Sequence, residues 1–126
     1  IEHGFLASDE TIQMMVDHGT FLVSTTYLTD AMAIDRIAPE LRKKAEEVFP
    51  KAKAMLPKAI AAGVRIACGT DAPAIPHSQN AKELGALVAR GMTPMQAIQA
   101  ATQQHKHQPS FTRGRWRSPR APSEWQ

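Results

Sequence analysis

Residues 64–71 read Val-Arg-Ile-Ala-Cys-Gly-Thr-Asp, and this stretch decides the predicted fold. Its first five residues are mostly apolar and end at Gly69, which is typical of a short buried strand. Asp71 follows directly after the strand. In parallel α/β folds, catalytic side chains gather at the carboxyl ends of strands, so Asp71 is a candidate catalytic residue. The same Gly-Thr-Asp could instead form a simple turn with a helix cap, for which Asp is well suited.

A second polar strand end stands at the start of the chain, where residues 1–4 read Ile-Glu-His-Gly. His3 precedes Asp71 by 68 residues. A (β/α)8 barrel of about 250 residues uses roughly 31 residues for each strand and helix, so the two residues are expected about two units apart. Residues 20–26 (TFLVSTT) predict the strand between them. Considered alone, a histidine after a strand is more often a hydrogen-bonded structural residue than a ligand.

Helices are predicted between these strands. Ser8 is placed to cap a helix that Gly19 ends. Residues 39–62 have apolar side chains at spacings of three and four, which is typical of one helical face. Pro50 and Pro57 lie inside this stretch and predict a kink or two successive helices. The predicted buried stripe consists of Leu41, Ala45, Val48, Ala52, Met55 or Leu56, and Ala59.

Two further helices are predicted after Asp71. Asn80 and Glu83 have the spacing of a helix start, and Gly91 ends that helix. Residues 93–102 begin with a capping-box spacing and proline at the first helical position. The alternation of strands and helices favours a parallel α/β arrangement. Five methionines are expected to fill the core, namely Met14, Met15, Met55, Met92 and Met95.

The excess positive charge lies in one segment of the chain. The 126 residues have a net charge of +3. Residues 1–102 hold ten basic and eleven acidic side chains, whereas residues 103–126 hold five basic side chains and one acidic. The second segment is rich in Arg, Pro and Ser and has no apolar period, so we expect it to be disordered or foreign to the fold. We therefore divide the chain into a domain, 1–102, and a basic tail, 103–126.

Composition excludes some function classes. No apolar run approaches the roughly 20 residues of a membrane-spanning helix, so no membrane association is expected. The slightly acidic net charge of residues 1–102 argues against a nucleic-acid-binding face. Cys68 is the only cysteine and is expected to be a buried thiol. The compartment stays open, with the cytoplasm favoured.

Four segments together resemble a known family. IEHG (1–4), GTDA (69–72), PHSQN (76–80) and ELGALVARGMTPMQAIQAAT (83–102) are similar, in order and spacing, to the C-terminal part of an amidohydrolase-superfamily enzyme. The most similar subgroup is that of the imidazolonepropionase-like and Xaa-Pro dipeptidase-like enzymes. Each motif is weak singly, but the ordered set is specific. The resemblance implies an α/β fold that forms about strands six to eight of a (β/α)8 TIM-type barrel.

The resemblance also implies an active site. His3 matches the histidine after strand six, which binds a metal in binuclear members and can orient the attacking water in mononuclear ones. Asp71 matches the aspartate after strand eight, a metal-site residue that also moves protons. The implied cofactor is one or two divalent metal ions, with Zn²⁺ favoured. His77, after strand eight, and Tyr27, after the middle strand, are expected to contact substrate.

The implied parent enzyme hydrolyses an amide or other C–N bond in a dipeptide, a cyclic amide or a small acyl-amine. The family site also needs ligands after strands one, four and five, none of which can be placed in this chain. Catalytic zinc usually has three protein ligands, so we predict a fragment that is inactive alone. The resemblance implies a homo-oligomeric parent.

After residue 102 the chain departs from the family pattern, and we hypothesise that residues 103–126 arise from a frameshift. Translation of the two other reading frames after Thr102 tests this hypothesis. Two other functions remain open: a non-catalytic fragment whose tail binds nucleic acid through Trp116 and Arg117, and a non-hydrolytic α/β binding module.

Overall fold

The computed structural model describes residues 1–32 and 38–103. The chain order is helix, strand, two helices, strand and three further helices, which is an α/β fold. The elements are α1 (Asp9–Asp17), β1 (Phe21–Ser24), α2 (Leu28–Ala31), α3 (Pro39–Ala62), β2 (Arg65–Cys68), the short 3₁₀ helix η2 (His77–Gln79), α4 (Lys82–Ala89) and α5 (Pro94–Thr102).

The strands are parallel, and the N-terminal segment extends the sheet. β1 and β2 pair with Leu22 opposite Ile66. On the other side of β1, Glu2 forms a parallel bridge with Val23, and the His3 amide donates to the Val23 carbonyl at 3.0 Å. Three parallel stretches therefore lie in the order 1–3, β1, β2. Their carboxyl ends share one edge.

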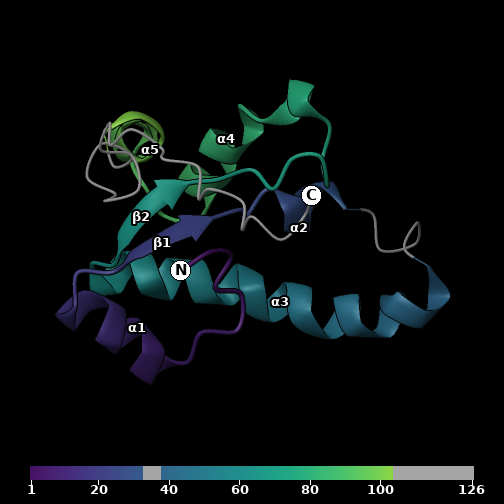
Figure 1. The fold of residues 1–126 in the computed structure, drawn as a ribbon, viewed down its shortest axis with the longest axis horizontal. Coiled ribbons are helices and arrows are strands. Elements are labelled where there is room, and N and C mark those ends of the chain that lie inside the picture. Colours follow the sequence, from purple (N-terminus) through teal and green to yellow (C-terminus); the bar gives the residue numbers. More distant parts are fainter. Residues whose placement is uncertain (33–37, 104–126) are drawn as a thin grey trace, which may run out of the picture.

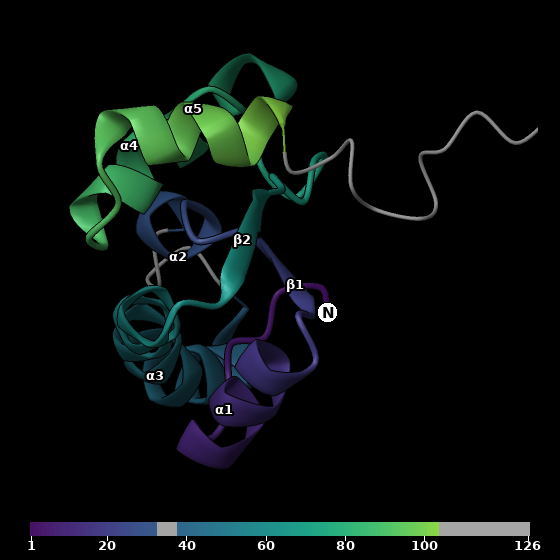
Figure 2. The same ribbon diagram turned by 90° about the vertical axis from the view of Figure 1, so that its left-hand side faces the viewer.

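Helices lie on both sides of the strands (Figures 1 and 2). α1 and α3 pack together on one side, whereas α4 and α5 pack together on the other, with α5 against β2. The connection from β1 to β2 runs through α3. A crossover of this kind is needed to join two neighbouring parallel strands.

The core joins the strands to both helical layers. Leu22 of β1, Leu56 of α3 and Leu87 of α4 are at most 2% exposed. Burial of each such side chain stabilises the fold by about 1.5–3 kcal/mol. These contacts hold the strand ends, and hence the predicted site, on a packed support.

The long helix differs from the sequence-based prediction. α3 is one helix that continues through Pro50 and Pro57. Of the two expected alternatives, two successive helices is therefore wrong, and a kink stays a prediction. Each proline removes one amide hydrogen bond, but the buried face of the helix is kept through this region. Five predicted stripe positions are confirmed as buried, namely Ala45, Ala52, Met55, Leu56 and Ala59.

Three residues expected in the core are exposed instead. Leu41 is 56% exposed, Met14 54% and Met95 61%. The first turns of α3 extend beyond the strands (Figure 1). Helical spacing predicts which side chains share a face, but not whether another element covers that face.

Two predicted helix starts are confirmed. The Ser8 hydroxyl accepts from the Thr11 amide at 3.2 Å, and Thr93 and Gln96 form a reciprocal capping box. Both caps join residues three positions apart. Such local bonds follow from short sequence patterns.

Predictions about the tail fall on residues of which the structure describes only Gln103. The disorder, frameshift and nucleic-acid hypotheses therefore lie outside the described residues. Within residues 1–32 and 38–103, no helix is both long and apolar enough to cross a lipid bilayer.

Candidate active site

His3 ends the first parallel segment in a left-handed backbone conformation. Its φ is +60°, and its amide is fixed by the Val23 carbonyl. Gly4 follows with φ +63°, and a Cβ atom there would lie 2.5 Å from Leu22 Cδ1. Glycine is favoured at position 4 by its positive φ, and a larger residue there would displace the terminal methyl group of Leu22. This turn holds His3 at the edge where the strands end.

The imidazole of His3 is half-buried and has one defined partner. Its Nδ1 lies 2.9 Å from Thr25 Oγ1, and Phe5 contacts the ring with centroids 5.7 Å apart. Among the described residues, Nε2 has no hydrogen-bond partner. A histidine held through one ring nitrogen offers the other to a metal or to water.

Asp71 is placed by the continuation of the β1–β2 pairing. The Gly69 amide donates to the Ser24 carbonyl at 2.7 Å. A Cβ at Gly69 would lie 2.8 Å from Val23 Cγ1 and 3.0 Å from that carbonyl oxygen, so a larger residue there would push the strands apart. Asp71 itself is exposed and has φ +52°.

His3 and Asp71 share an unusual backbone feature. Within residues 1–32 and 38–103, they are the two non-glycine residues with positive φ. A positive φ is uncommon for residues other than glycine, and among those Asn, Asp and His adopt it several-fold more often than the rest. It costs of order 1–3 kcal/mol and clusters at functional sites. The feature singles out the same two positions as the sequence patterns do.

Tyr27 and η2 lie together at this edge. The Tyr27 hydroxyl donates to Gln79 Oε1 at 2.9 Å, and Lys82 Nζ lies 5.5 Å from the centre of the Tyr27 ring. His77 begins η2 and is exposed. The tyrosine proton is thus engaged with Gln79, two residues from His77.

Glu83 is a buried polar residue, whereas the sequence pattern predicts that it pairs with Asn80 at the start of a helix. Glu83 does not pair with Asn80 to cap a helix, because α4 has no side-chain cap. Its carboxylate turns inward, is 0% exposed and accepts from Ser24 Oγ at 2.6 Å, the Thr26 amide at 2.8 Å and the Tyr27 amide at 2.7 Å.

The spacing of Glu83 on its helix indicates that its side chain faces the core. Glu83 stands four positions before the fully buried Leu87, and residues four apart lie on the same helical face. A glutamate on the apolar face of a helix needs buried partners. Which partners it has could not be deduced, because Ser24 is 59 positions away.

Cys68 lies near Glu83 and is not a reactive thiol. Burial, with a smaller contribution from the Glu83 charge, raises the pKa of Cys68 from 9.0 to about 11. The thiolate is the reactive form of cysteine. At neutral pH the folded protein therefore holds about a hundredfold less thiolate than a thiol of pKa 9.0.

We expect alkylation of Cys68 by iodoacetamide at pH 8 to be at least about a hundredfold slower in the folded protein than in urea, as measured by mass spectrometry. Because the folded pKa is raised, the stability linked to this thiol is present below pH 9.0. It is lost as the pH rises towards about 11. Equal alkylation rates in both states would contradict this assignment.

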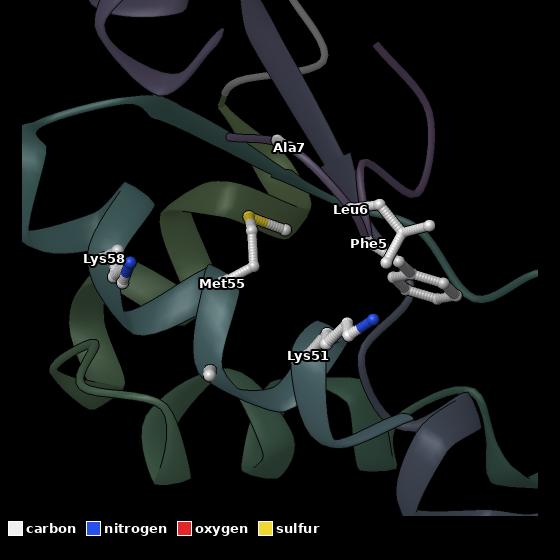
Figure 3. Close-up of a pocket in the computed structure, with 7 residues that line it drawn as sticks. Phe5, Leu6, Ala7, Lys51, Met55 and Lys58 are labelled. Atoms are coloured by element: carbon white, nitrogen blue, oxygen red, sulfur yellow. The ribbon is translucent and has the colours of Figure 1, made fainter. Parts of the chain in front are cut away.

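A groove of about 290 Å³ lies between residues 5–7 and α3, with Lys51 and Lys58 on its helical side (Figure 3). None of the four predicted site residues lines it. We therefore do not assign this groove to the site.

The described residues contain no group of three or more His, Cys, Asp and Glu side chains that could hold a metal. His3 and Asp71 have the right chemistry for such a site, since imidazole and carboxylate are common zinc ligands. Two ligands are fewer than the usual three. The residues fit part of a metal site and would need ligands from elsewhere.

Residues 1–105 match the Amidohydrolase family. The chain belongs to this family. Two solved structures resemble the amidohydrolase chain. One is a Xaa-Pro dipeptidase with bound methionine in its active site, with 39% identity, a TM-score of 0.76, and coverage of 83% of this chain and 27% of that one. The other is the A. niger ochratoxinase, with 35% identity, a TM-score of 0.70, and coverage of 82% and 24%.

Curated relatives of this amidohydrolase chain include uncharacterized proteins from Mycobacterium bovis and Mycobacterium tuberculosis. Each is 36% identical over 107 residues. The match covers 80% of this chain and 29% of the relative. The chain thus spans under a third of the length of these relatives.

Proposed function

We propose that the complete protein hydrolyses an amide or related C–N bond in a small substrate, and that this chain provides strands six to eight of its barrel. One observation carries the proposal. His3 and Asp71 end the first and third of three adjacent parallel stretches, and both have left-handed backbone angles. Family membership and two solved neighbours support it.

A bound divalent metal, Zn²⁺ in our proposal, would lower the pKa of bound water to near neutral and so would supply a nucleophile at neutral pH. His3 would hold the metal through Nε2 or would orient the attacking water. Asp71 takes a proton from that water and delivers it to the leaving amine nitrogen as the C–N bond breaks. Exposure of the Asp71 carboxylate at the strand edge leaves it free to reach both groups.

We assign substrate contacts to Tyr27 and His77, which lie at the same edge. A dipeptide is the favoured substrate because a solved neighbour with 39% identity is a Xaa-Pro dipeptidase. A cyclic amide and a small acyl-amine are the other classes to test. A homo-oligomeric state and a cytoplasmic location stay predictions.

The test is an assay of the protein that contains this chain within a complete barrel. Xaa-Pro dipeptides, cyclic amides and N-acyl amino acids are supplied in turn, before and after removal of metal by a chelator. We expect amine release that chelation abolishes and Zn²⁺ restores. The isolated 126-residue chain is expected to show no turnover. Full activity after chelation, or turnover by the isolated chain, would overturn the proposal.

A further inference from the structure

The end of β1 and the two residues after it contact two polar groups, the Glu83 carboxylate and the His3 ring. Ser24, Thr25 and Thr26 are consecutive and buried. The Ser24 hydroxyl and the Thr26 amide both donate hydrogen bonds to the Glu83 carboxylate. Thr25, between them, places its hydroxyl 2.9 Å from Nδ1 of His3.

These bonds make a continuous path from α4 to the His3 ring. Thr25 cannot shift along the strand edge without breaking a hydrogen bond of Ser24 or Thr26. The two bonds to Glu83 are buried and the bond to His3 is part-buried. Loss of a partner in a buried bond leaves a polar group unsatisfied at about 1–3 kcal/mol. The buried carboxylate therefore holds the Thr25 hydroxyl in place.

The space beside the ring reinforces this constraint. A void of only about 10 Å³ is lined by His3, Thr25 and their neighbours. This volume is at the lower limit for a single water. Within the described residues, Thr25 is the side-chain partner of Nδ1.

We propose that Thr25 and Glu83 are positioning residues, in which Glu83 fixes Thr25, and the Thr25 hydroxyl fixes the ring orientation of His3 by accepting a hydrogen bond from Nδ1–H. The lone pair of Nε2 is then free. Nε2 is then the nitrogen presented to the metal or the attacking water, and this last step rests on the proposed function. Outer partners of histidine ligands commonly set the tautomer in this way. Loss of such a partner costs about 10–100-fold in metal affinity or activity.

The first test uses the complete protein, free of metal and labelled with ¹⁵N-histidine. NMR then measures the resonances of the two imidazole nitrogens of His3. We expect well-separated resonances of one tautomer in the wild type. Thr25→Val should move them towards exchange-averaged values, whereas Thr25→Ser, which keeps the hydroxyl, should restore the wild-type pattern. Unchanged His3 resonances in Thr25→Val would overturn the proposal.

Thr29→Val is the matched control, because it also removes a buried threonine hydroxyl, one bonded to the Thr26 carbonyl. It should leave the His3 resonances unchanged. Glu83→Gln should shift them, because its amide group faces backbone donors and cannot accept all three bonds. An equal effect of Thr29→Val, or no effect of Glu83→Gln, would refute the proposed path.

Activity of the complete enzyme separates this inference from the proposed function. We expect Thr25→Val to lower kcat by about 10–100-fold with little change in KM. A shifted NMR signature with unchanged kcat would support the positioning and contradict the role proposed for His3. An unshifted signature would refute the positioning, whatever the activity.

Discussion

Replacement of Asp71 by Asn is expected to lower kcat of the complete enzyme by about 10³-fold, within the 10²–10⁴ range for a residue that transfers protons. Asn has nearly the same shape but cannot accept a proton from water. It also tolerates the left-handed backbone that residue 71 adopts. The loss should therefore be chemical and not structural, as measured by steady-state kinetics beside urea unfolding.

The control for this substitution is His77→Ala, which removes an exposed side chain from η2. If His77 contacts only substrate, KM should rise by a few-fold, on the order of 1 kcal/mol of binding, with kcat nearly unchanged. An Asp71→Asn enzyme that keeps more than a tenth of its kcat would remove Asp71 from the proton-transfer role.

Glu83→Ala is expected to have the largest effect on stability, lowering the free energy of unfolding by about 3–5 kcal/mol. The substitution leaves one hydroxyl and two backbone amides buried without their acceptor, at about 1–3 kcal/mol each and not fully additive. It also opens a cavity beside β1. Urea unfolding followed by circular dichroism measures the change.

Glu46→Ala is the matched control, because Glu46 is an exposed glutamate on α3. It should change the free energy of unfolding by less than about 0.5 kcal/mol. Similar losses for the two substitutions would mean that the Glu83 bonds contribute no more than a surface side chain does.

The candidate site was partly predictable from sequence. His3 and Asp71 stand at strand ends, and the structure confirms their positions at a shared edge of parallel strands. Their catalytic roles stay predictions. The sequence did not distinguish a helix cap from a buried acceptor at Glu83, because a glutamate three residues after Asn80 also matches the cap pattern. Only its partners on β1 distinguish the two interpretations.

The sequence alone determined the order of the strands and of α1, α3, α4 and α5, the helix caps at Ser8 and Thr93, and the strand ends that carry His3 and Asp71. It did not predict α2 or η2. These features depend on residues at most a few positions apart, whose interactions recur wherever the pattern occurs. The continuity of α3 through its prolines and the burial of Glu83 were decided by the tertiary structure. The tertiary structure also decided the contact between His3 and Thr25, which are 22 positions apart in the sequence. Such contacts depend on how whole elements pack, and side-chain spacing along the chain carries no information about the partner.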